Sequence, residues 1–150
     1  MINVENIIYG SEIKALNIDN TPSKIHLKNI KFLLNKVLIP IEKAWTSYCY
    51  SNKIGVGGIN IIRGYISNNI NDKLIIPESK DSAHLNGYGV DTVPINGNII
   101  EYEKFLKNYF DNRNFDELIE EKPRCGKPSW IHISYKNQDG KQRKKIYRRI

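Results

Sequence analysis

The sequence contains only two cysteines, it has no long apolar run, and it begins without a secretory leader. Cys49 and Cys125 could form one bond or remain as buried thiols, but they provide no framework of disulfides. No stretch reaches the roughly 18 to 20 uncharged apolar residues that a membrane-spanning helix needs, because the longest candidate, residues 54–62, is short and rich in glycine. Residues 1–6 lack the basic and apolar regions of a signal peptide, so we expect synthesis in the cytoplasm and any export by another route.

With 150 residues, the chain has the length of one ordinary domain. Hydrophobic residues make up 40% of it and aromatic residues 10%, which is too much apolar material for a disordered tail. The sequence also has no internal repeat and no low-complexity tract. We therefore expect residues 1–150 to fold as a single domain around one core.

The net charge of +7 by itself favours a negatively charged partner, but the cations are distributed unevenly along the chain. Six of the 23 Lys and Arg residues lie within residues 141–149, and without them 17 cations face 16 acids. Basicity is therefore a property of the C-terminal segment 141–150, which suits any polyanion: nucleic acid, phospholipid or an anionic cell wall. The alternative is a terminal strand whose basic side chains protect the edge of a sheet.

Apolar residues recur at steps of three and four from Pro22 to Trp45, which predicts one long core helix. Thr21 is its candidate N-cap, and Pro40 should kink or interrupt it. A second amphipathic helix is predicted around residues 100–110, after an Asn-Gly turn. A short helix at residues 12–16, capped by Ser11, and a turn at residues 17–20 should precede both.

Several segments rich in β-branched and aromatic residues predict strands, and the polar segment between them, residues 66–82, reads as a loop or short helix. The predicted strands are residues 59–62, 115–120, 130–135 and a basic terminal strand after the Asp-Gly turn at 139–140. Helices and strands in separate blocks indicate the α+β class, with a small, mainly antiparallel sheet packed against the N-terminal and central helices.

Two histidines and one aspartate supply nitrogen and oxygen donors of the kind that bind Zn²⁺. His84 and Asp91 lie in one segment, where Gly87 and Gly89 argue against a helix, so a loop must turn both side chains toward one point. The second histidine, His132, lies in a predicted strand. Three protein ligands would leave a fourth coordination position for water, which is the arrangement of catalytic zinc sites.

Alternation along the strand at residues 130–135 decides where His132 points. One face carries Trp130, His132 and Ser134, and the other carries Ile131, Ile133 and Tyr135. The isoleucine face should pack on the core, so His132 faces away from it, where a site could form. For His26, inside the long helix, we expect a structural role instead.

The motif Ser82-x-His84-x-x-Gly87-x-x-x-Asp91, followed far downstream by Trp130-x-His132, resembles the LAS group of zinc peptidases. This group includes D-Ala-D-Ala carboxypeptidases, phage L-alanyl-D-glutamate endopeptidases and the hedgehog signalling domain. The resemblance extends over most of the chain, because residues 11–22, 63–71 and 115–121 are similar to three further segments of the family. It implies a fold like that of the hedgehog domain and the D-Ala-D-Ala peptidases.

By this resemblance, His84, Asp91 and His132 are the ligands of Zn²⁺. Glu121 takes the place of the catalytic glutamate, which would remove a proton from the zinc-bound water and then protonate the leaving amine. The alternative reading makes Glu121 a surface acid like its neighbour Glu120, and the register does not decide between the two.

Arg63, Trp130, Tyr88 and Ser82 are the further candidate site residues. Arg63 would bind a substrate carboxylate or the oxyanion, or else form a surface ion pair. Trp130 and Tyr88 flank the ligands and could line a groove for a glycan or peptide stem, or else belong to the core or its rim. Ser82, the first residue of the motif, is included with them as a substrate contact.

Two positions depart from the family pattern. Many members carry a carboxylate three residues before the final histidine, where this chain has Ser129, so Glu121 must reach the water from the preceding strand. The family's arginine after Gly-Tyr is Ile66 here, and Arg63 lies on the other side of Gly64. In an extended segment these two positions point to opposite faces, so Arg63 can substitute only if the local turn allows it.

The resemblance implies a zinc metallopeptidase that hydrolyses an amide bond in the peptide stem of peptidoglycan. The basic segment would help to retain it on the anionic wall. The small size, the missing signal peptide and an isoleucine- and asparagine-rich composition suggest a phage or prophage product, released onto the wall at lysis or carried in a virion. The alternatives are a catalytically silent structural or virion protein of the same fold and, with the basic segment as its only support, a nucleic-acid binder.

Overall fold

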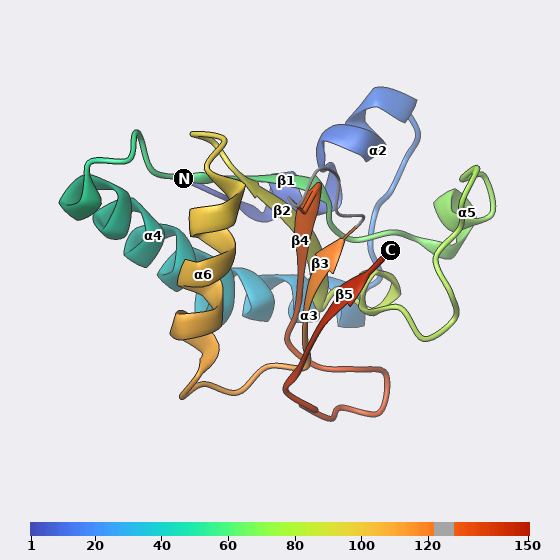
Figure 1. Cartoon of the computed structure of the whole chain (residues 1–150). Coiled ribbons are helices and arrows are strands. Elements are labelled where there is room, and N and C mark those ends of the chain that lie inside the picture. Colours follow the sequence, from blue (N-terminus) through green and yellow to red (C-terminus); the bar gives the residue numbers. More distant parts are fainter. Residues whose placement is uncertain (122–127) are drawn as a thin grey trace.

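The computed structural model describes residues 1–121 and 128–150 (Figure 1); five helical elements come first along the chain, and three strands come last. The helices are α1 (Val4–Ile8), α2 (Ser11–Leu16), α3 (Lys24–Leu33), η1 (Leu34–Leu38), α4 (Ile39–Asn52), α5 (Asn68–Asn71), η2 (Ala83–Leu85) and α6 (Ile99–Phe110). The strands are β1 (Ile59–Arg63), β2 (Gly89–Pro94), β3 (Glu117–Glu121), β4 (Trp130–Ser134) and β5 (Lys145–Arg149).

The strands form one mixed sheet in the order β1-β2-β4-β3-β5. The pairs β1–β2, β2–β4 and β3–β4 are antiparallel, and only the edge strand β5 runs parallel to its neighbour β3. The chain is therefore an α+β protein with a mainly antiparallel sheet, as its sequence predicts. The basic C-terminal segment contributes a strand at the sheet edge, which the sequence left as one of two alternatives.

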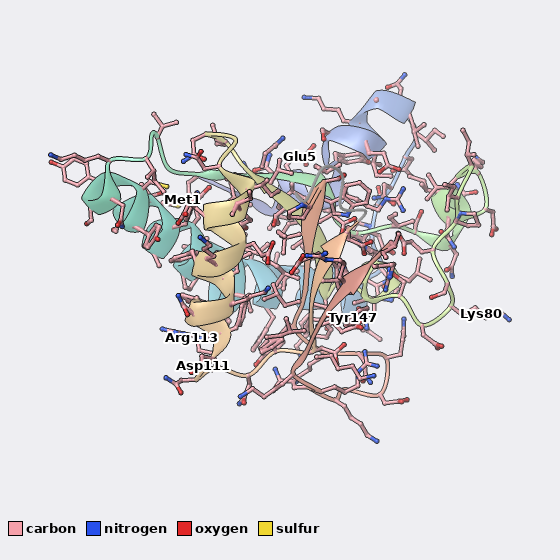
Figure 2. All side chains as sticks on the ribbon, viewed as in Figure 1. Met1, Glu5, Lys80, Asp111, Arg113 and Tyr147 are labelled. Atoms are coloured by element: carbon pink, nitrogen blue, oxygen red, sulfur yellow. The ribbon has the colours of Figure 1, made fainter. Side chains whose placement is uncertain are left out.

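The main core lies between one face of the sheet and the helices α3, η1, α4 and α6. Trp45 of α4 is fully buried and contacts Tyr102 and Phe105 of α6. Leu118, Ile131 and Val90 face the same core from three neighbouring strands. Side chains accordingly fill the space between α6 and the sheet in Figure 2. The opposite face of the sheet carries Asp91, His132 and Glu121, together with the buried Ile119.

The long helix is present, but its bounds differ from those predicted. Its N-cap is Ser23, whose hydroxyl accepts a hydrogen bond from the His26 N–H at 3.2 Å, rather than Thr21. The interruption predicted at Pro40 takes the form of the wider π-helical turn η1, which lies directly before it and accommodates the missing N–H, and α4 follows without a break. The helix then continues beyond Trp45 to Asn52, where Lys53 adopts a left-handed conformation with φ 53°.

The N-terminal region contains one helix that the sequence did not predict. The five-residue helix α1 is too short for a periodic pattern, and reciprocal hydrogen bonds between Asn3 and Asn6 cap it. The predicted helix before residue 17 is α2, although Gly10 is its N-cap and Ser11 its first residue. Asn17 ends it with φ 52°, which begins the predicted turn.

Two sequence expectations concern membranes and cysteines. No helix in the described part of the chain is long and apolar enough to cross a membrane. Cys49 is buried in the core, where its sulfur accepts a hydrogen bond from the Asn96 side chain at 3.3 Å. Cys125 lies outside the described residues, so the choice between one bond and two buried thiols is not tested.

Candidate metal centre

Strand register brings two of the three candidate ligands together. In the pairing of β2 with β4, Asp91 lies directly opposite His132, and on its other side Asp91 pairs with Arg63 of β1. Side chains of directly opposite residues share a face of the sheet. His132 therefore points away from the core that Ile131 and Ile133 enter, as the alternation of β4 predicts.

His84 reaches the same point from the short turn η2, which precedes β2. Ser82 caps this turn by accepting a hydrogen bond from the His84 N–H at 3.2 Å. Gly87 then turns the chain with φ +85°, a conformation that other residues rarely adopt, and β2 begins at Gly89. The two glycines thus end one turn and begin one strand, and no helix joins His84 to Asp91.

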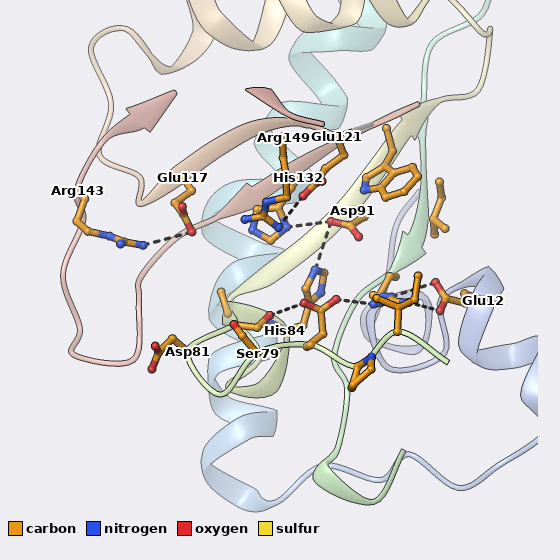
Figure 3. A pocket seen from close by; sticks show the side chains of 18 residues that line it. Glu12, Ser79, Asp81, His84, Asp91, Glu117, Glu121, His132, Arg143 and Arg149 are labelled. Atoms are coloured by element: carbon orange, nitrogen blue, oxygen red, sulfur yellow. Dashed lines mark hydrogen bonds and ion pairs between the residues drawn. The ribbon is translucent and has the colours of Figure 1, made fainter. Parts of the chain in front are cut away.

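The three candidate ligand residues are buried, and their donor atoms converge. Asp91 lies between the two imidazoles in Figure 3, with its Oδ1 atom 3.3 Å from His84 Nε2 and 2.9 Å from His132 Nδ1. All three donor atoms lie within 4.8 Å of one another. His84 Nδ1 donates to the Gly64 carbonyl at 2.8 Å, which fixes the ring and leaves Nε2 as the ligand atom. The cluster can therefore hold a metal ion.

The electrostatic interactions within the cluster favour the protonated form of His84. Burial alone would lower the pKa of His84, but the Asp91 carboxylate and the hydrogen bond to it outweigh burial and raise the pKa of His84 to about 9. Burial opposes the charge on Asp91 too, yet the two imidazoles hold the pKa of Asp91 below its ordinary value. A metal ion that enters this site must displace the His84 proton.

The structure separates Glu121 from Glu120, which the sequence could not. Glu121 lies opposite Trp130 in the β3–β4 pairing, on the face that carries His132, and it lines a cavity of about 580 Å³ together with the three ligands. Glu120 points to the helix face, where it accepts a hydrogen bond from Lys107 of α6 at 2.9 Å. Glu121 is therefore the carboxylate on the side of the metal cluster.

The Glu121 carboxylate is almost completely buried and has one cationic partner among the described residues. Its Oε1 atom accepts a hydrogen bond from Arg149 Nη1 at 3.1 Å, and 7% of its side chain is exposed. Burial raises the pKa of Glu121 above its ordinary value, and the Arg149 charge opposes this rise. A carboxylate with a raised pKa can exchange protons closer to neutral pH than an exposed glutamate.

Arg63 lines the same cavity, because a β-bulge between Ile61 and Arg63 turns it to the face opposite the one that Ile61 presents to the core. Its guanidinium is held by two carboxylates, those of Glu12 and Glu78. Ile66, at the position of the family's arginine, is fully buried in a small second cluster. The local turn therefore places Arg63 in the cavity, but with both sides of its guanidinium already paired.

Glu78 is a cavity residue that the sequence did not reveal. Its Oε2 atom accepts a hydrogen bond from Ser82 Oγ at 3.0 Å, and its backbone N–H donates to the Asn71 side chain at 2.7 Å. Burial would raise the pKa of Glu78, but His84 and Arg63 lower it below its ordinary value. The polar segment before residue 82 has no periodicity that could have placed this side chain, and its position depends on the Asn71 contact.

The remaining predicted site residues have different surroundings. Trp130 lines the cavity beside the ligands. Ser82 also lines it, but its hydroxyl is engaged by Glu78 and by the η2 backbone, so its contacts are those of a cap. Tyr88 is not among the described residues that line the cavity, and its ring packs against Phe32 and Tyr135. The structure thus brings Trp130 and Ser82 to the site and leaves Tyr88 at the edge of the core.

Half of the cations of the C-terminal basic segment are paired with acids of the adjacent strand and the residue before it. Arg143 donates to Asp116 at 2.7 and 2.8 Å. On β5, Arg148 bonds Glu120 and Arg149 bonds Glu121, on opposite faces of the sheet. These ion pairs hold the terminal strand against β3. They also neutralise much of the positive charge that would otherwise be available to bind a polyanion.

Comparison of the chain with protein-family models, with curated proteins and with solved structures finds no match.

Proposed function

We propose that this chain is a zinc peptidase of the LAS type, with a fold like that of the hedgehog domain and the D-Ala-D-Ala peptidases, and that it hydrolyses an amide bond in the peptide stem of peptidoglycan. The observation that carries the proposal is the convergence of His84, Asp91 and His132 at one cavity that Glu121 also lines. This is the set of residues that the resemblance names, and they come from four separate segments of the chain.

The donor set suits Zn²⁺ in kind and in spacing. Two imidazole nitrogens and one carboxylate oxygen are common zinc ligands, and ligands at about 2.1 Å in a tetrahedral arrangement lie roughly 3.4 Å apart. The separations of 3.3 and 2.9 Å between Asp91 and the two histidines are close to this spacing. The hydrogen bond from His84 Nδ1 to the Gly64 carbonyl is the type of outer contact that orients histidine ligands of metals.

A zinc ion bound by these three residues would polarise the scissile carbonyl and lower the pKa of a bound water toward about 7. Glu121 lies on the same face of the sheet and would accept the proton of that water. Its raised pKa then allows it to return the proton to the nitrogen of the leaving amine. Trp130, opposite Glu121 on β4, would form one wall of the groove for the peptide stem.

Metal analysis tests the centre of the proposal. We expect one zinc ion per chain in protein purified without added metal, and loss of that zinc in His132→Ala. His26→Ala is the matched control, because His26 bonds the Tyr65 hydroxyl at 2.9 Å, outside the ligand cluster, and should leave the zinc content unchanged. A wild-type protein that binds no zinc, or a His132→Ala variant that retains it, would contradict the assignment.

Cleavage of muropeptides tests the activity. Purified muropeptides of several wall types are incubated with zinc-loaded wild type, Glu121→Gln and Glu120→Gln, and new termini are detected by mass spectrometry. We expect the wild type and Glu120→Gln to cleave, and Glu121→Gln to be slower by about 10² to 10⁴-fold. The two glutamates are similarly buried, each bonds one arginine of β5, and they differ in the face of the sheet that they occupy.

The ion pair between Glu121 and Arg149 also favours a second candidate, a catalytically silent protein that keeps the fold and the metal. An arginine that permanently neutralised Glu121 would remove its use as a base. Zinc-loaded wild type that cleaves no muropeptide would select this candidate, and the chain would then be a structural protein, for example of a virion.

For an active enzyme, we propose that it is made in the cytoplasm of a bacterial host from a phage or prophage gene. It would reach the wall after release at lysis or as part of a virion. The lysines of the basic segment, residues 141, 144 and 145, would contribute to retention on the anionic wall.

A further inference from the structure

Among the described residues, three arginines line the cavity of the metal cluster, and they differ in how completely carboxylates neutralise them. Arg63 is held by Glu12 and Glu78, and 17% of its side chain is exposed. Arg143 bonds the buried Asp116 and lies 3.2 Å from Glu117. Each of these guanidinium groups therefore has two carboxylate partners. Neither guanidinium therefore keeps an unneutralised positive charge that could bind an anionic ligand.

Arg149 differs from both. Among the described residues, its guanidinium has one carboxylate partner, Glu121, and one neutral partner, the Tyr147 hydroxyl at 3.1 Å. Its side chain is 53% exposed, which leaves N–H donors accessible from the cavity. A guanidinium carries five donors in a planar fork and can bind two carboxylates at once. Of the three arginines that line the cavity in the described part of the chain, Arg149 is thus the one with the capacity to bind an anion.

The parallel pairing of β5 with β3 places this cation beside the reacting groups. Arg149 lies opposite Glu121, and Glu121 lies opposite Trp130, so the three residues form one row across three strands on the side of His132. In a peptide, the α-carboxylate of the residue that contributes the scissile nitrogen is two bonds away from that nitrogen. A substrate amide held at the metal cluster would therefore bring such a carboxylate into the same cavity.

We propose that Arg149 binds the free carboxylate of the residue on the amine side of the scissile bond, which selects substrates that carry this carboxylate over their amidated forms. This inference rests on the proposed peptidase function and specifies its substrate class. In the free protein, Glu121 occupies part of the guanidinium. An arriving substrate carboxylate shares or replaces this contact, which frees Glu121 to act on the water. Arg149 is a substrate-binding residue in this scheme, and no proton passes through it.

The test compares two stem peptides that differ only in the leaving residue, which carries either a free α-carboxylate or the corresponding amide. Wild type, Arg149→Gln, Arg149→Lys and Arg148→Gln are assayed with both peptides. Arg148 is the matched control, because it lies on the same strand, is 56% exposed and bonds Glu120 at 3.0 Å on the other face. The folded state of each variant is checked by its unfolding midpoint.

We expect the wild type to prefer the free acid, and Arg149→Gln to raise its KM for the acid by about 10- to 100-fold, the range for a lost charge-assisted hydrogen bond. With the amide, this variant should lose only the activity that depends on the contact between Arg149 and Glu121. The loss with the acid should be larger, so the preference for the acid disappears. Arg149→Lys should retain part of the preference. Arg148→Gln should retain all of it.

Equal losses with both peptides would overturn the proposal, because they would show that Arg149 acts only on Glu121 or on the oxyanion. A wild type without preference for the acid would overturn it as well. If zinc-loaded wild type cleaves neither peptide, the peptidase function fails, and calorimetric binding of the two intact peptides then decides the inference separately. Equal affinity of wild type and Arg149→Gln for the acid would refute it.

Discussion

The metal-free protein should lose stability as the pH rises from 7 to 9, because of one buried proton. The pKa of His84 is about 9 in the folded protein against an ordinary value of 6.5, so the folded state binds this proton more tightly than the unfolded chain. The resulting stabilisation is fully present below pH 6.5 and disappears as the pH rises through about 9. The full effect is about 3 kcal/mol, and about 2 kcal/mol of it should be lost between pH 7 and 9.

Chemical denaturation of protein treated with a chelator, at pH 7, 8 and 9, measures this loss. His84→Gln is the control, because it removes the titrating group, and its stability should vary much less over the same range. The pKa of His26 is lowered by burial, so its contribution has the opposite sign and is almost complete by pH 7. Metal-free wild type whose stability stays constant or increases from pH 7 to 9 would refute the reasoning.

Bound metal should reverse this dependence. A metal ion requires neutral imidazoles, so its affinity should rise with pH below about 9, by about tenfold per pH unit for one displaced proton. Titration calorimetry with zinc at pH 7, in buffers with different heats of ionisation, should show close to one proton released per ion. Release of no proton would mean that His84 is already neutral in the metal-free protein.

Two substitutions test the scaffold around the cluster. Gly64→Ala would place a methyl group 2.1 Å from the Ile7 carbonyl oxygen, so we expect it to lower the free energy of unfolding by about 1 to 3 kcal/mol. The same clash would displace the Gly64 carbonyl that orients His84, so we also expect weaker metal binding. Asn20→Ala would remove a buried side chain that donates to the Ile8 and Tyr65 carbonyls at 2.7 Å each, so denaturation should show a loss of about 3 kcal/mol. The exposed Asn112→Ala should change stability by less than about 0.5 kcal/mol.

Local patterns in the sequence were sufficient for the strand that carries His132. The period of a strand is two, so alternate isoleucines fix which face enters the core and leave His132 on the other face. The same rule distinguishes Glu121 from Glu120 only once the register of β3 against β4 is known. Register depends on pairing between segments, and a single strand contains no record of it.

The surroundings of Arg63 show the same limit more clearly. Its direction depends on a β-bulge, and its two carboxylate partners come from positions 51 residues before and 15 residues after it. No spacing rule relates Glu12, Arg63 and Glu78, because a loop and a separate helix bring the carboxylates to the cavity. The sequence thus identified the three residues that converge in the cluster, which belong to recognisable motifs, but not the groups that determine the charge around them.

The C-terminal strand illustrates how register controls the chemistry of this cavity. A shift of β5 by one residue would turn Arg149 to the helix side of the sheet and bring Arg148 or Ile150 opposite Glu121 in its place. The contacts that prevent such a shift lie at the start of the strand. Asp116 is 1% exposed and binds the Arg143 guanidinium through both carboxylate oxygens, and its backbone carbonyl accepts the Lys145 N–H at 2.8 Å.

Asp116 therefore influences the cavity from the opposite end of β5, because it fixes which residue of β5 faces Glu121. Weakening it, for example in Asp116→Asn, should loosen the register of β5 without touching any residue of the ligand cluster. The basic segment that dominates the net charge of the sequence is thus better understood as part of the cavity wall. Three of its cations are committed to β3 and its preceding residue, and one of these three, Arg149, remains exposed enough to meet a ligand.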